Sequence, residues 1–396
     1  MQVYFPYLNA LGFITRFNLT LVPGLAPRGN TTTRYVDFST GLPSAYTGPN
    51  SSLQQAATLN FYNALISNNY TSLIEPGFWN LPPGPEIPED LLLPIGAFAQ
   101  KYNATAALSR IWSAVGGGVG SRGNFTSQLT LTVLQSFSPA WIKVYLGSPI
   151  YHIQDGNQRL YNAIAAMLGN DVLLTSTVTA SSRNATGVEL LVSTPSGMKL
   201  IIAKKLLLAI PPTRETLIPF DLNANETQHF SRPQYGRYHT ALISHPSLPR
   251  GVELTNVPPS SNVTEEPFLE TPYILSLSSY GNDSSLSGLG TSGNPYASYT
   301  PGAGAALAER NLQAMADAGT VHDLGGKSME IVEWSDHQAG GYGVSAQEMR
   351  GGWMERMYSL QGVRSTWFTG NAIAVDFSTV LWGFNDDLLE RMFKAW

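Results

Sequence analysis

The sequence contains no cysteine, and few of its residues carry a charge. The absence of cysteine from all 396 residues excludes disulfide bonds, thiolate nucleophiles, cysteine-rich zinc sites and any cofactor joined through a cysteine sulfur. Charged residues make up only 13% of the chain, and the net charge of −5 provides no basic surface. Because nucleic acids and anionic lipids bind through such surfaces, we expect neither as a partner.

Long apolar runs, metal-binding clusters and catalytic triads are also missing. No apolar run approaches the roughly 20 residues of a membrane-spanning helix, so we expect no membrane span. No His-x-x-x-His or similar group suggests a metal site, and we predict none. His152 and Asp155 invite interpretation as a hydrolase pair, but no Gly-x-Ser-x-Gly turn accompanies them. What is present is a chain of 43% hydrophobic and 11% aromatic residues, typical of a globular protein and long enough for two domains.

Glycosylation signals are unusually frequent. Ten Asn-x-Ser/Thr sequons occur where chance would give roughly four, at Asn18, Asn30, Asn50, Asn69, Asn103, Asn124, Asn184, Asn225, Asn262 and Asn282. They are either accidental matches on a surface rich in Ser, Thr and Asn, or acceptor sites of a secreted or vacuolar glycoprotein. The second interpretation conflicts with the segment from Met1 to Pro6, which has neither the basic part nor the cleavage site of a signal peptide. We therefore expect residues to be missing ahead of Met1.

The clearest organisation lies between residues 153 and 212. Apolar residues at helical spacing predict a helix that ends at Gly169. The following segments alternate with turns and predict the strands of a meander, at 172–179, 188–194 and 199–203. A continuous apolar run at 206–210, ended by two prolines, is typical of a fully buried strand in a parallel sheet.

Three further elements are expected between this block and the end of the chain. Ser, Gly and Asn dominate 277–304, so we expect a long surface loop there. Residues 305–318 predict a helix closed by Gly319. A short strand is expected at 331–334.

The last segment is a second clear unit. A short apolar strand begins at Thr366, a turn follows at Gly370, and apolar residues at three- and four-residue spacing then predict a helix. Asp376 and Ser378 are typical N-cap residues, so we expect the helix to begin beside them. A helix that starts after a buried strand and a glycine turn offers N–H groups and a positive dipole end to a ligand.

This order of elements resembles the flavin-dependent amine oxidase superfamily. The matching parts are the helix, the meander, the buried strand ending in Pro-Pro, a Trp followed by Gly-Gly-Tyr, and the final strand–Gly–helix unit. Two motifs are similar to the fungal branch of β-cyclopiazonate dehydrogenase-like proteins, Lys-Lys-Leu-Leu-Leu-Ala-Ile-Pro-Pro-Thr at 204–213 and Leu-Gln-Gly-Val-Arg-Ser-Thr-Trp-Phe-Thr-Gly at 360–370.

The resemblance implies an α/β (α+β) fold with two interleaved domains. A partial, Rossmann-like FAD-binding domain with a three-stranded β-meander would comprise 1–12, 150–215 and 325–396. A mixed substrate domain would comprise 13–149 and 216–324.

One part of the family pattern is absent. Members begin with a strand–Gly-x-Gly-x-x-Gly–helix unit, an acidic residue for the adenosine ribose and a Gly-Gly-Arg segment, and none of these occurs here. The glycines from Gly116 to Gly120 are no substitute, since no buried strand precedes them. In the family a segment like Gln2-Val3-Tyr4 follows that unit. We therefore expect a truncated chain that lacks the N-terminal βαβ segment and, with it, a signal peptide.

The resemblance also implies FAD contacts. Because cysteine is absent, the FAD would be held non-covalently, which we expect, or through some other residue. Val178 matches a valine whose backbone meets the adenine, although it could equally be an ordinary core valine. Gly370 and Asn371 would lie beside the ribityl and pyrophosphate region, but the family usually has an acidic or small residue near Asn371. The start of the last helix would face the pyrimidine carbonyl of the flavin, through Ser378, Thr379 and Val380.

Three residues would face the substrate. Trp334 and Tyr342 match aromatic residues that flank the reactive face of the flavin, although they could instead pack a domain boundary. His337 lies between them in sequence and could be a polar group of the site.

The function implied is an FAD-dependent oxidoreductase of the amine oxidase type. It would transfer hydride from a small amine or alkaloid-like secondary metabolite to the flavin, with O2 as a candidate acceptor. The alternative is a truncated, non-catalytic secreted glycoprotein that retains the substrate domain as a binding unit. The missing glycine-rich unit favours this alternative, because it removes the main anchor for the pyrophosphate.

Overall fold

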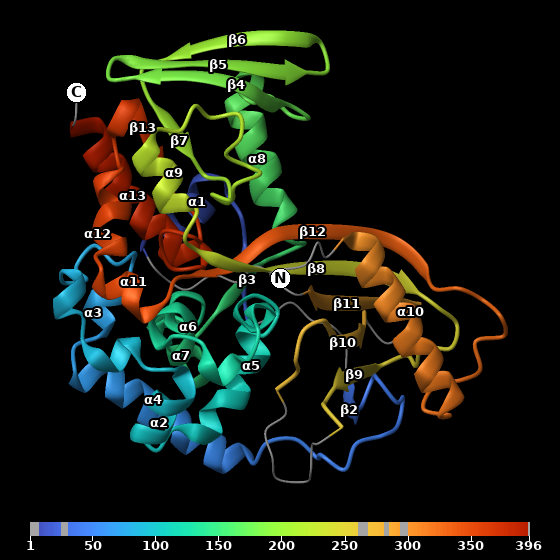
Figure 1. The fold of residues 1–396 in the computed structure, drawn as a ribbon. Coiled ribbons are helices and arrows are strands. Elements are labelled where there is room, and N and C mark those ends of the chain that lie inside the picture. Colours follow the sequence, from blue (N-terminus) through green and yellow to red (C-terminus); the bar gives the residue numbers. More distant parts are fainter. Residues whose placement is uncertain (1–7, 25–30, 260–267, 281–284, 294–299, 395–396) are drawn as a thin grey trace.

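The computed structural model describes residues 8–24, 31–259, 268–280, 285–293 and 300–394 (Figure 1). A three-stranded antiparallel sheet and a parallel strand pair lie at one end, and a six-stranded sheet and a block of helices lie at the other. This mixture of helices and sheets confirms the expected α/β (α+β) class. One large core contains residues of both expected domains, such as Leu190 and Phe98.

The expected meander is present. Strands β4 (Thr177–Asn184), β5 (Gly187–Thr194) and β6 (Gly197–Ala203) pair antiparallel in chain order. Every second side chain in the middle of β5 is buried, so one face of the meander packs on the core. The first strand begins at Thr177 and not at 172, because Thr175 has a φ of 51°, which interrupts extended chain.

A parallel strand pair lies beside the meander. Strand β7 (Leu206–Leu208) pairs in parallel with β13 (Thr366–Phe368), as the sequence predicts. The apolar run at 206–210 is not fully buried, because Ala209 and Ile210 are exposed beyond the end of β7. The carboxyl ends of two neighbouring strands therefore meet at one accessible edge.

Helices flank this pair. Helix α8 (Gln158–Leu168) ends at Gly169, as expected. Helix α13 (Ser378–Lys394) also begins where the sequence predicts, and its buried apolar residues recur at four-residue spacing at Val380, Phe384, Leu388 and Met392. The other helices in this part of the molecule are α1 (Leu8–Arg16), α9 (Ala224–Phe230), α11 (Ala346–Arg350) and α12 (Trp353–Ser359).

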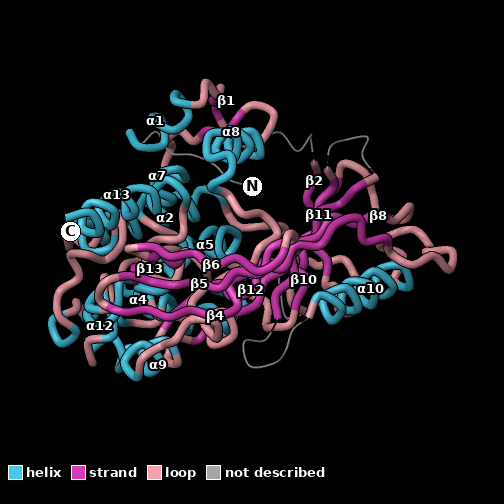
Figure 2. Tube along the Cα trace, turned by 90° about the horizontal axis from the view of Figure 1, so that it is seen from above, coloured by secondary structure: helices cyan, strands magenta, loops and turns pink. Residues whose placement is uncertain are grey.

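The six-stranded sheet has the order β12-β8-β11-β10-β9-β2, and Figure 2 shows it beside α10 (Pro301–Asp317). Its strands are β2 (Thr32–Val36), β8 (Gln234–Ser244), β9 (Val252–Asn256), β10 (Tyr273–Ser279), β11 (Leu286–Gly293) and β12 (Glu330–Gly343). Apolar side chains of the sheet, including Ala241 and Ile243, share a core with Leu312 and Met315 of α10.

Two expectations for this region are wrong. Residues 277–304 are not one surface loop, since they contain the end of β10 and all of β11. Small residues are needed there because a Cβ on Gly288 would lie 2.6 Å from the Tyr280 ring. The strand expected at 331–334 is part of the 14-residue β12, whose pairing with β8 continues past Gly340 through several register shifts.

The remaining helices form a block beneath the parallel pair (Figure 1). They are α2 (Ser51–Ser67), α3 (Thr71–Ile74), α4 (Ile95–Lys101), α5 (Leu108–Val115), α6 (Thr130–Ser136) and α7 (Pro139–Tyr145). A small antiparallel pair, β1 (Leu21–Pro23) with β3 (Tyr151–Ile153), lies near α1. Among the described residues, no helix combines the length and apolar character that crossing a membrane requires.

Candidate functional site

The carboxyl ends of β7 and β13 form the centre of the candidate site. The Thr369 N–H donates to the Leu208 carbonyl at 2.9 Å, which extends the pairing beyond β13. Gly370 follows with a φ of 112°, a conformation that favours glycine. Among the described atoms, a Cβ at Gly370 would have only the Ala209 carbonyl oxygen within 4 Å, at 3.8 Å. A ligand can therefore approach this backbone closely.

The segment 370–376, called the Gly370 turn below, is held from behind by Gln135 of α6. The side-chain amide of Gln135 donates to the Asn371 carbonyl at 2.5 Å and to the Ala374 carbonyl at 3.1 Å. Its backbone carbonyl accepts from the Asp376 N–H at 2.8 Å. Sequence reasoning missed Gln135. The signal that could have found it is an amide at a buried position of an apolar helix, because such a group needs a partner.

The start of α13 adjoins the Gly370 turn. Ser378 is half-buried, and Thr379 and Val380 are buried. The Leu381 N–H donates to the Phe377 carbonyl at 2.8 Å and closes the first turn. N–H groups that precede such a bond point out of the helix end, where the dipole is positive. The structure thus brings five of the six expected FAD contacts together in one turn and the helix that follows.

Val178, the sixth expected contact, lies on a different element, the first strand of the meander. It is half-buried near the start of β4. The other end of β4 meets the chain that leads into β13, because the Ser365 hydroxyl donates to the Asn184 carbonyl at 2.8 Å. At about 3.3 Å per residue, Val178 lies roughly 20 Å from that junction along the strand.

A buried ion network joins β4 to β13. The guanidinium of Arg183 is fully buried and donates to both carboxylate oxygens of Glu226 at 3.0 Å. It also donates to Asp221 at 3.0 Å and to the Thr366 hydroxyl at 3.1 Å. Burial raises the pKa of Asp221, but hydrogen bonds from Arg183 and Ser181 outweigh it and hold that pKa below its usual value. The network fixes the start of β13, the strand that leads to Gly370.

Trp334 and His337 lie on opposite faces of the six-stranded sheet. The Trp334 indole packs toward α10, since a Cβ on Gly304 would lie 2.9 Å from its ring. The indole N–H donates to His239 Nδ1 at 3.2 Å. His337 instead bonds the Thr240 hydroxyl at 3.0 Å, and Thr240 alternates with the α10-facing residues of β8.

Tyr342 is placed at the other end of β12 from Trp334. It is buried, and its ring lies 5.6 Å from that of Tyr235. Burial raises the pKa of its phenol well above the usual value. The two aromatic residues are eight positions apart on the strand, roughly 25 Å of extended chain. The structure therefore does not bring Trp334 and Tyr342 together as a pair.

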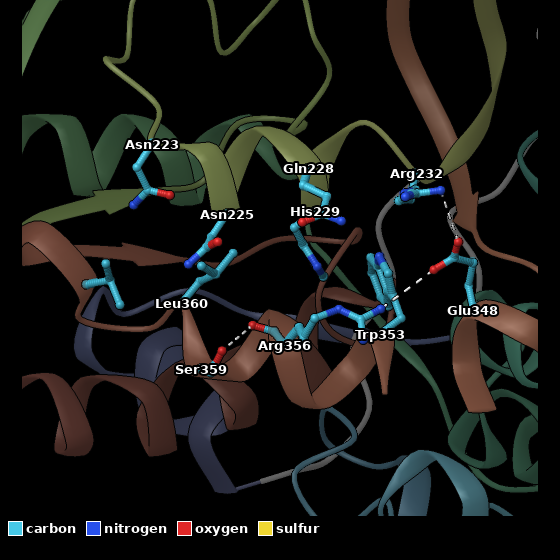
Figure 3. A pocket seen from close by; sticks show the side chains of 11 residues that line it. Asn223, Asn225, Gln228, His229, Arg232, Glu348, Trp353, Arg356, Ser359 and Leu360 are labelled. Carbon is cyan, nitrogen blue, oxygen red and sulfur yellow. Dashed lines mark hydrogen bonds and ion pairs between the residues drawn. The ribbon is translucent and has the colours of Figure 1, made fainter. Parts of the chain in front are cut away.

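A pocket of about 300 Å³ lies between α9 and α12 (Figure 3). Arg232 and Arg356 both pair with Glu348, at 3.4 and 3.6 Å. The ring of His229 stacks on Trp353 with centroids 4.6 Å apart. Burial, followed by the charge of Arg356, lowers the pKa of His229 to about 4, so this histidine is neutral at pH 7. Sequence reasoning did not single out this pocket.

The sequons that the structure describes all lie at the surface. Asn18, Asn50, Asn69, Asn103, Asn124, Asn184 and Asn225 are exposed. Asn30, Asn262 and Asn282 lie outside the described residues. In two of the exposed sequons the threonine hydroxyl donates to the side-chain oxygen Oδ1 of the asparagine, at 2.8 Å for Asn124 and 2.7 Å for Asn184.

Solved structures with the same fold are flavoenzymes and a fatty acid isomerase. A fatty acid isomerase from P. acnes matches 99% of this chain and 86% of its own, with a TM-score of 0.71 and 17% identity. Putrescine oxidase matches 100% of this chain and 87% of its own, with a TM-score of 0.60 and 15% identity. The molecule has the fold of the FAD-dependent amine oxidases.

Sequence relatives define the family more closely. β-Cyclopiazonate dehydrogenase of Aspergillus oryzae is 31% identical over 369 residues, which cover 90% of this chain and 74% of that protein. The FAD-dependent oxidoreductase oblC of Cochliobolus heterostrophus is 30% identical over 389 residues, covering 94% of this chain and 76% of that protein. The chain belongs to this family of fungal FAD-dependent oxidoreductases. No protein-family model matches it.

The described residues fit FAD at the flavin end. Gly370 leaves its backbone open to a ligand at the strand edge, and the start of α13 offers a positive helix end beside it. The expected cofactor and the expected oxidoreductase class are confirmed by the family. Which atoms contact the FAD stays a prediction for all six residues, as does the division into two domains.

Proposed function

We propose that the protein oxidises a small amine or alkaloid-like secondary metabolite. FAD supplies the hydride acceptor. The substrate would lose a hydride from a carbon next to nitrogen and become an iminium, and O2, as the final acceptor of the two electrons, would be reduced to hydrogen peroxide. The observation that carries the proposal is the Gly370 turn followed by α13, in a chain of this family with the amine oxidase fold.

The chain's own residues have three tasks in this proposal. The Gly370 backbone admits the cofactor, and the start of α13 stabilises negative charge that develops on the reduced flavin. Gln135 and the Arg183 network keep the turn and its strand in place. Trp334, His337 and Tyr342 stay candidate substrate-side residues, with His337 on the sheet face away from α10.

The first experiment tests cofactor binding by Gly370. A Gly370→Ala variant should weaken FAD binding about tenfold, equivalent to ~1.4 kcal/mol, because a Cβ would enter the ligand approach. Gly197→Ala is the matched control, since Gly197, the first residue of β6, has a similar φ of 113° and open space around it. Visible flavin absorbance after desalting is the measurement. Equal flavin loss in both variants would show that backbone strain, and not contact between FAD and Gly370, causes the loss.

The second experiment tests the reaction. The flavin-loaded protein is mixed without oxygen with primary, secondary and cyclic amines, and bleaching of the flavin bands is recorded. Readmission of O2 should restore the bands and release one peroxide per substrate oxidised. If the chain retains no flavin after desalting, the alternative of a non-catalytic glycoprotein is favoured.

The secretory pathway is the proposed location. Seven described sequons are exposed, which supports glycosylation of the folded chain. Expression through a eukaryotic secretory route, followed by peptide mapping with and without glycosidase, tests the proposal. Glycans at Asn124 and Asn184 are expected first, and a chain with no glycan at any sequon would contradict the proposed location.

A further inference from the structure

Among the buried polar groups of the described residues that have no hydrogen-bond partner, three belong to residues around the Gly370 turn. They are the Tyr342 hydroxyl, the Thr132 hydroxyl and the Trp353 indole N–H. Their residues are 3%, 2% and 5% exposed, so bulk water does not reach them. A buried polar group without a partner destabilises a fold by about 1–3 kcal/mol, and native proteins rarely leave such groups unsatisfied.

All three residues line one small cavity behind the Gly370 turn. The cavity has about 10 Å³ of room for the centre of a water molecule. Gln135 and Ala372 belong to the same lining, and the remaining walls are mainly apolar, from Phe78, Leu131, Met349 and Met354. Space on this scale suits one water molecule, and a buried water typically has two to four polar partners. Thr132, Tyr342 and Trp353, which line the cavity, carry three polar groups that lack a partner.

We infer that this cavity is a binding site for a single water molecule bridging Tyr342, Thr132 and Trp353. The two hydroxyls can each donate or accept, and the indole N–H donates. The water would connect β12, α6 and α12, between which the described residues show no direct side-chain hydrogen bond at this point. A larger ligand does not fit the volume, and a dry cavity would leave all three groups unsatisfied.

The proposed water site would support the Gly370 turn. Thr132 lies on α6 one turn before Gln135, which bonds two carbonyls of that turn. Ala372 of the turn contributes to the cavity wall. The water would therefore link Tyr342 of β12 to α6, the helix that holds the Gly370 turn.

The experiment compares variants of the whole chain by urea unfolding. Thr132→Val and Tyr342→Phe keep side-chain shape and remove one hydroxyl each. Each should lower the unfolding midpoint by about 0.3 M, because the water loses a partner. The double variant should lower the midpoint by less than the sum, since both changes remove the same bridge. Thr130→Val is the matched control on α6, because its buried hydroxyl donates directly to the Leu93 carbonyl at 2.8 Å.

The sign of the shift decides the outcome. In a dry cavity, removing an unsatisfied hydroxyl stabilises the protein, so Thr132→Val and Tyr342→Phe would raise the midpoint while Thr130→Val still lowers it. Such a rise would overturn the inference, and so would strict additivity of the two lowered midpoints. A high-resolution crystal structure should also show a density peak within 2.5–3.0 Å of both hydroxyl oxygens. A featureless cavity would refute the site.

Discussion

The junction between the meander and β13 is held by buried charges, whereas the junction between the six-stranded sheet and α10 is held by apolar packing. At the first, Arg183 and Glu226 are both fully buried and joined by paired hydrogen bonds. At the second, Ile243, Leu312 and Met315 share a core. Directional bonds fix one position of the strand that leads to Gly370, while apolar contacts hold α10 mainly by shape.

The two junctions should therefore lose stability to different extents when a residue in them is replaced. Removing one partner from a buried ion pair leaves an uncompensated charge, which destabilises far more than the pair itself contributes. Adding or removing an apolar atom in a packed core has a smaller effect that depends on how the neighbours relax.

The largest expected effect is therefore at Arg183. An Arg183→Met variant leaves Glu226 buried without its bidentate partner and should lower the free energy of unfolding by about 3–5 kcal/mol. Urea unfolding followed by tryptophan fluorescence measures it. Lys394→Met, which removes an exposed pair with Glu390, is the control and should change stability by less than about 0.5 kcal/mol. Similar losses in both variants would contradict the distinction between the junctions.

Acid should weaken the charged junction through His229, which lies on α9 with Glu226. Burial lowers the pKa of His229 from 6.5 to about 4, so the folded state binds this proton less well than the unfolded chain. The contribution of neutral His229 to the free energy of unfolding is complete above pH 6.5 and is lost as the pH falls from 6.5 toward 4. The loss is on the order of 3 kcal/mol.

A pH series of unfolding midpoints tests this expectation. The ring of His229 faces Trp353 and Met357, and Arg356 is the charge that acts on it. His229→Phe keeps the stacking on Trp353 and should flatten the stability profile between pH 6.5 and 4. An unchanged slope in the variant would mean that other carboxylates or histidines carry the acid sensitivity.

The two junctions also differ in how far the sequence predicts them. The helix and strands before 212, and the final strand–Gly–helix unit, follow from periodic apolar residues that signal one buried face. Strand β11 could not be found this way, because its Gly290 is required by the Tyr238 side chain of a strand distant in sequence. The role of Gln135 could not be predicted from the sequence either, since its partner Asn371 lies 236 residues away.

The smallest expected effect tests the apolar junction at Gly304 of α10. Replacing glycine inside a helix by alanine normally stabilises by up to about 1 kcal/mol. A Cβ on Gly304, however, would lie 2.9 Å from two carbons of the Trp334 ring and 3.2 Å from a methyl carbon of Thr291. Gly304→Ala should therefore lower the free energy of unfolding by about 1–2 kcal/mol through overpacking.

The double variant Gly304→Ala/Trp334→Leu decides the cause. If overpacking against the ring is responsible, the alanine should be neutral or stabilising once the indole is gone, measured against Trp334→Leu alone. A Gly304→Ala variant more stable than the original chain would show that α10 can move away from the sheet at this point without loss of stability. The apolar junction would then be looser than the charged one in geometry as well as in energy, because shape alone would not fix the separation between α10 and β12.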